Sequence, residues 1–68
     1  MMNVAGLRML TAALALLGEM DAAAEARATL LRLQPQFSLA WVTENVPLAG
    51  KAAERLREGL RKAGVPEG

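Results

Sequence analysis

The apolar residues of the first segment repeat with the period of an α-helix. Steps of three, three, four and three residues separate Val4, Leu7, Leu10, Leu14 and Leu17. Steps of this size bring side chains to one face of a helix. The spacing therefore predicts a helix here, with these five residues facing the rest of the chain.

A second helix is predicted to follow after a short turn. Its apolar positions step by three, four and three residues through Ala23, Ala26, Leu30 and Leu33. Asp21 suits an N-cap or a first helical turn, and Pro35 ends the helix. Gly18 suits the left-handed residue that closes the first helix, and so short a turn leaves the helices antiparallel. An αα-hairpin over residues 4–35 results.

The hairpin resembles a tetratricopeptide repeat, a helix-turn-helix unit with large, small, aromatic and Pro residues at set positions. The corresponding residues are Leu7, Leu10, Thr11, Leu14, Ala23, Arg27 and Pro35. The departures are Leu7 for Trp, Thr11 for Gly or Ala, Leu14 for Tyr, and Arg27 for an aromatic residue. The resemblance implies a repeat packed by aliphatic rather than ring side chains. The alternative is a generic Ala/Leu helical hairpin without repeat ancestry.

Both aromatic residues of the chain, Phe37 and Trp41, follow the hairpin. Ser38 can cap a short helix over residues 38–46, which Pro47 ends. Trp41 has two interpretations. It closes the open end of the hairpin, or it is an exposed anchor for a partner.

The last predicted helix spans residues 48–64, with Gly64 and Pro66 ending it. Its apolar face comprises Ala49, Ala52, Ala53, Leu56, Leu60 and Ala63. The helix is also locally basic, through Lys51, Arg55, Arg57, Arg61 and Lys62. A basic amphipathic helix can bind nucleic acid or an acidic membrane surface. Because Glu54 and Glu58 partly neutralise these cations and no aromatic residue separates them, the other interpretation is a solvated outer face.

The C-terminal half is similar to the end of tetratricopeptide arrays in bacterial adenylate cyclase-like signalling proteins. The similarity rests on residues 31–40, Pro47 and residues 54–67. It implies a tail that follows the final repeat and caps the array. The link before the last helix, residues 47–50, departs from the Asp-Pro type of that family. The cyclase domain of such a protein would lie elsewhere, and none of its metal-binding or nucleotide-binding residues is assigned to this chain.

Off the face predicted to meet the second helix, the first helix carries another set of mainly small apolar residues. Together with Trp41, this set is the candidate interaction surface: Ala5, Arg8, Ala12, Ala15, Leu16 and Trp41. In tetratricopeptide arrays the corresponding face lines a peptide-holding groove, so the resemblance favours this surface. The alternative is that the set packs against another helix of the chain or of a second copy.

The residue types needed for common catalytic sites are missing or scattered. The chain has no His and no Cys, which excludes Ser-His and Cys-His nucleophiles. Asp21 is the single Asp, the six Glu residues are not clustered, and the six Gly residues form no phosphate-binding loop. We therefore expect no enzyme activity, cofactor, metal or small-molecule substrate.

The length of 68 residues favours one all-α domain over residues 1–68. So short a chain buries little core and has no disulfide or zinc site to add stability, so we expect self-association into a homo-oligomer. A net charge of +1 gives no overall attraction for nucleic acid.

The apolar run from Met9 to Leu17 has two other interpretations, a membrane-spanning segment and a signal peptide. It has about half the length that a spanning helix of about 20 residues needs. Arg8 before it and Ala24-Glu25-Ala26 after it imitate a signal peptide. Glu19 and Asp21 interrupt that pattern. Neither membrane insertion nor secretion is expected, and the lack of cysteine is compatible with the cytoplasmic location that we expect.

Overall fold

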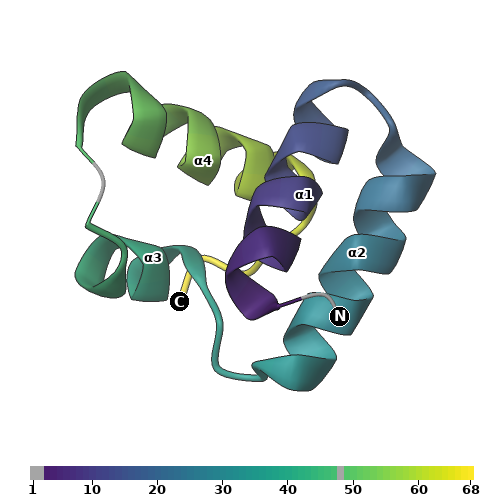
Figure 1. Ribbon diagram of the computed structural model, residues 1–68, viewed down its shortest axis with the longest axis horizontal. Coiled ribbons are helices and arrows are strands. Elements are labelled where there is room, and N and C mark those ends of the chain that lie inside the picture. The colour runs from purple at the N-terminus through teal and green to yellow at the C-terminus, as the bar shows by residue number, and fades with distance from the viewer. Residues whose placement is uncertain (1–2, 48) are drawn as a thin grey trace.

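The computed structural model describes residues 3–47 and 49–68. Over these ranges the chain forms four helices and no strand, which confirms the all-α prediction. The helices are α1 (Val4–Leu16), α2 (Met20–Leu33), α3 (Leu39–Asn45) and α4 (Gly50–Lys62) (Figure 1). The last helix was expected to begin at Leu48, which lies outside the described residues.

The ends of α1 follow from its sequence. Asn3 is the N-cap, and its side-chain oxygen accepts a hydrogen bond from the Gly6 N–H at 2.6 Å. At the other end Gly18 adopts φ +84°, and the Glu19 N–H donates to the Leu14 carbonyl at 2.9 Å. A left-handed glycine with this bond closes a helix and turns the chain back. As a result α2 runs beside α1 in the opposite direction (Figure 1).

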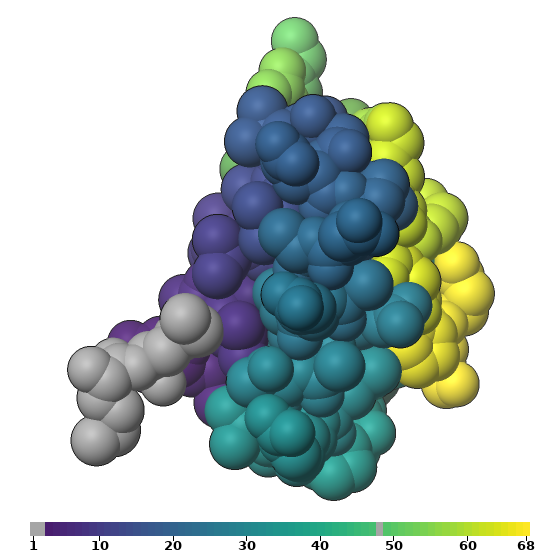
Figure 2. Space-filling model, turned by 90° about the vertical axis from the view of Figure 1, so that its right-hand side faces the viewer, coloured from purple at the N-terminus to yellow at the C-terminus, as the bar shows by residue number. Residues whose placement is uncertain are grey.

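α1 is the central element of the fold. It packs against α2 on one side and against α4 on the other, and α4 crosses behind it (Figure 1). Figure 2 shows α2 forming the side of the molecule, with α1 along one edge and the C-terminal segment along the other. Each of the two neighbouring helices therefore covers a different flank of α1.

The crossing of α1 and α4 is very close. A Cβ atom added to Gly59 would lie 2.6 Å from the Ala12 carbonyl oxygen and 2.8 Å from the Ala12 Cβ. Only two small residues allow the backbones to approach this far. The contact fixes α4 against the middle of α1.

The main core lies between the hairpin, α3 and α4. Phe37, Leu7, Leu30 and Leu60 are among its fully buried side chains, and the rest of the main cluster is Ala12, Ala26, Leu39, Val42, Leu56 and Val65. A smaller cluster of Ala15, Ala23 and Ala63 joins the first, second and last helical segments at the other end. Small residues thus bring three segments together where the core narrows.

The C-terminal tail connects α4 to α3. Ser38 caps α3 by accepting from the Trp41 N–H at 3.0 Å. The carbonyls of Pro66 and Glu67 accept from the N–H groups of Leu39 and Ala40, each at 2.9 Å. These bonds satisfy donors in the first turn of α3 that have no partner within the helix.

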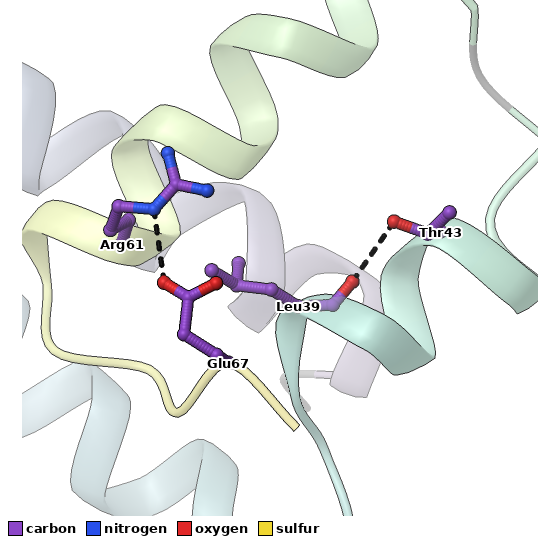
Figure 3. A network of polar contacts seen from close by, with 4 residues as sticks. All are labelled: Leu39, Thr43, Arg61 and Glu67. Atoms are coloured by element: carbon purple, nitrogen blue, oxygen red, sulfur yellow. Dashed lines mark hydrogen bonds and ion pairs between the residues drawn. The ribbon is translucent and has the colours of Figure 1, made fainter.

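Figure 3 shows the side chains beside this junction. Glu67 in the tail reaches back to Arg61 in α4 at 3.1 Å, and Thr43 donates to the Leu39 carbonyl at 3.2 Å. Both ends of the Arg61–Glu67 pair are well exposed, so the pair adds little to stability. The tail is held mainly by its backbone hydrogen bonds.

α4 ends as its sequence predicts. Gly64 has φ +93°, and the Val65 N–H donates to the Leu60 carbonyl at 3.0 Å. Arg27 of α2 also donates to the Ala63 carbonyl at 3.0 Å. A cation at the C-terminus of a helix is favourable, since carbonyl groups there carry partial negative charge. Arg27 thereby takes a structural position at the end of α4.

The buried face of α1 differs from the predicted face. Leu7, Thr11, Ala12 and Ala15 are buried, whereas Leu10 and Leu17 are 40% and 77% exposed. Apolar residues surround this helix almost completely, so their spacing does not select one face. The prediction for Leu10 and Leu17 was wrong because the small residues permit closer helix contacts.

The predicted faces of the other two long helices hold in their central parts. Ala23, Ala26 and Leu30 of α2 are buried, but Leu33 is 57% exposed. In α4 and at its end Ala53, Leu56, Leu60 and Ala63 are buried, whereas Ala49 and Ala52 are exposed. The exposed positions lie near helix ends, beyond the regions of helix contact.

Candidate interaction surface

One face of α1 is apolar and exposed. We name it the outer α1 face; it comprises Ala5, Gly6, Met9, Leu10, Ala13, Leu16 and Leu17. Met9 is 57% exposed and Leu16 40%. Arg8, the charged residue of this helix, lies on a different side. An exposed apolar face without a charge is typical of a contact with another molecule or segment.

A groove runs along one edge of this face, between α1 and α4. It has a volume of about 290 Å³ and is lined by Met9, Ala12, Ala13, Leu16, Ala52, Arg55 and Leu56. The helices touch at Ala12 and Gly59, and the groove lies beside this contact, with Ala12 in its lining. Its lining is apolar apart from Arg55, which places one positive charge at the edge.

A second hollow lies along the opposite edge, between α1 and α2. Its volume is about 260 Å³, and it is lined by Leu7, Leu10, Leu14, Ala22, Glu25, Ala26 and Thr29. Glu25 places a negative charge at this edge. The outer α1 face is therefore an apolar ridge with a basic edge on α4 and an acidic edge on α2.

Trp41 and Arg8 meet in an aromatic cluster at the open end of the hairpin. The Arg8 guanidinium carbon lies 4.6 Å from the Trp41 ring centre and 5.6 Å from that of Phe37. The two rings are 5.5 Å apart, and Arg8 also donates to the Gln34 side chain at 3.3 Å. Cation–π attraction and ring packing stabilise this arrangement. The cluster has the geometry of one of the two interpretations of Trp41, in which it closes the open end of the hairpin.

The structure divides the predicted interaction surface into three parts. Ala5 and Leu16 are exposed on the outer α1 face, and Leu16 also lines the groove. Arg8 and Trp41 lie together, but in the aromatic cluster. Ala12 and Ala15 are buried, at 4% and 2% exposed, and this corrects their assignment to a free surface. Their small side chains let other segments of the chain cover them, as the alternative interpretation expected.

The prediction missed several residues that the structure places on this surface. Met9 and Ala13 line the groove, and Leu10 and Leu17 were assigned to the core. The relevant sequence signal was the distribution of charge. Apart from Arg8, this helix has no charged residue that would mark the side facing water. Gly59 marks the point on α4 where another helix can approach closely, and Ala12 of α1 occupies that place.

The cations of α4 form two rows on the side of the helix that faces away from its buried residues. Lys51, Arg55 and Lys62 follow at steps of four and seven residues, which places them along one flank. Arg57 and Arg61 lie on another flank, where Glu67 pairs with Arg61. The structure therefore separates the basic set considered for nucleic acid or membranes into two groups.

Two further properties concern the described residues alone. No helix within them is long and apolar enough to cross a membrane. Over the same ranges, no group of three or more His, Cys, Asp or Glu residues is placed to hold a metal ion.

No protein-family model, curated protein or solved structure matches this chain.

Proposed function

We propose that this chain is a non-catalytic protein-protein interaction module that docks through the outer α1 face. The observation that carries the proposal is the uncharged, exposed ridge on the central helix. With only the described residues around them, Met9, Leu16 and Leu17 remain 57%, 40% and 77% exposed. Their contact with water is unfavourable, and a docked apolar surface would remove it.

The size of the face indicates weak association. Full burial of a large apolar side chain contributes roughly 1.5–3 kcal/mol. Met9, Leu10, Leu16 and Leu17 are already partly covered, so each would add about 1 kcal/mol. With equal numbers from a partner, the gain of about 8 kcal/mol is comparable with the roughly 4–15 kcal/mol cost of association. At the lower end of that cost the net gain is about 4 kcal/mol, which corresponds to a dissociation constant in the millimolar range.

The tetratricopeptide resemblance supports the same function. A repeat of this kind cannot bury both of its faces alone, and stacking on neighbours covers the remainder. In this interpretation α1 and α2 form the repeat, and α3, α4 and the tail form the cap of an array. The outer α1 face then docks on a neighbouring repeat, or on a second copy when no neighbour is present.

Sedimentation equilibrium from 5 μM to 500 μM tests this proposal. A growing fraction of the native chain is expected to self-associate toward 500 μM, whereas Leu16→Glu is expected to remain monomeric because it places a charge in the contact. Ala28→Glu is the control, since Ala28 is exposed on α2 and lines neither the groove nor the second hollow. A native chain that stays monomeric throughout, or equal association of the Leu16 variant, would contradict the proposal.

A further inference from the structure

We propose that the partner is a second copy of this chain, bound so that the two α1 helices run in the same direction. In this dimer the α4 edge of each copy faces the α2 edge of the other. The inference rests on the proposed function and adds the partner, its orientation and the pair of charges that selects it.

The outer α1 face is suited to contact with itself. Gly6 and Ala13, seven residues apart, lie along its centre. Met9 and Leu16 lie on the α4 side, and Leu10 and Leu17 lie on the α2 side, again at a spacing of seven. A seven-residue repeat allows two helices to remain in contact along their length. Small residues at the centre let the larger ones interlock beside them.

Two identical apolar faces can pair in more than one direction, and the charges at the edges distinguish these directions. Arg55 lies at the α4 edge, with Lys51 one turn before it. Glu25 lies at the α2 edge, with Asp21 one turn before it. All four residues are exposed. Each copy therefore presents a basic edge and an acidic edge on opposite sides of one ridge.

Symmetry determines which edges meet. A two-fold axis parallel to α1 exchanges the two sides of the ridge, so the basic edge of each copy faces the acidic edge of the other. A two-fold axis that is perpendicular to α1 and lies in the plane of the interface makes the helices antiparallel. It brings the basic edge of one copy to the basic edge of the other, and the acidic edge to the acidic edge. Because like charges across an interface are repulsive, the parallel arrangement is favoured.

The charges are available at matching heights along α1. Arg55 borders the groove beside Met9, Ala13 and Leu16, and Glu25 borders the hollow beside Leu10 and Leu14. Among residues 3–47 and 49–68, neither side chain takes part in an ion pair. Each can therefore pair with its counterpart on a second copy, giving two Arg55–Glu25 pairs per dimer.

Charge reversal tests this arrangement by sedimentation equilibrium. Arg55→Glu and Glu25→Arg each create two like-charge pairs, so each variant alone is expected to dimerise at least about tenfold more weakly. Mixing the two variants restores both pairs in a heterodimer, which is expected to form with native affinity. Glu54→Arg is the control for net charge, since it lies on the same helix as Arg55 and lines neither hollow. It is expected to leave the affinity within about twofold of the native value.

Other outcomes overturn the inference in distinguishable ways. In an antiparallel dimer Arg55→Glu associates as well as the native chain and prefers the native chain when mixed with it. If neither reversal changes a native self-association, the contact does not use these edges. Either result removes this inference and leaves the proposed function in place. A native chain that is monomeric at 500 μM removes both.

Discussion

Replacing Gly59 by alanine tests the closest contact in the fold. In a helix this exchange normally stabilises, since Gly is roughly 1 kcal/mol less favourable than Ala. Here the added Cβ would lie 2.6 Å from the carbonyl oxygen and 2.9 Å from the Cα of Ala12. Both atoms belong to the backbone, so rotation of a side chain cannot relieve the overlap.

The expected effect of Gly59→Ala is destabilisation by about 2 kcal/mol. Overpacking in a core costs roughly 1–3 kcal/mol, and overlap with backbone atoms places the cost at or above the upper end. Gain in helix propensity offsets about 1 kcal/mol of this cost. In a domain of this size, the melting temperature should fall by roughly 8–16 °C.

Thermal and urea unfolding followed by circular dichroism measure this change. All samples should be at one low concentration, because self-association would add to the apparent stability. Ala28→Gly on the exposed side of α2 calibrates the propensity difference alone, with an expected loss of about 1 kcal/mol. If Gly59→Ala stabilises the chain by a similar amount, α1 and α4 do not cross as described.

Three further substitutions address the helix ends and the aromatic cluster. Gly64→Ala should destabilise the chain by about 1–2 kcal/mol in urea unfolding, because its φ of +93° is unfavourable for alanine and the new Cβ would meet the Arg27 guanidinium. Ser38→Ala should cost about 1 kcal/mol and speed hydrogen exchange of the Trp41 amide, whose N–H bonds to the Ser38 hydroxyl; unchanged exchange would contradict the cap. Arg8→Met keeps most of the packing but removes the cation from Trp41, so tryptophan fluorescence should shift while helix content stays constant.

The interaction surface was only partly predictable from the sequence. Leu16 and Ala5 were correctly expected to be outside the contact with α2, and both are exposed. Ala12 could not be assigned, because its burial depends on Gly59, 47 residues further along the chain. The pairing of Arg8 with Trp41 likewise depends on how the segment after Pro35 returns to the start of α1.

The sequence by itself determined the helices and their ends. Periodic apolar residues located the helices. The Ser38 cap and the glycines at positions 18 and 64 act over a few neighbouring residues, and the structure shows these three in their expected roles. Only the tertiary structure decided which side of α1 stays exposed. Apolar residues almost surround that helix, so hydrophobicity favours burial in nearly every direction. The close fit of Ala12 to Gly59 then selects the side that α4 covers, α2 covers another side, and the face between these two helices remains in contact with water.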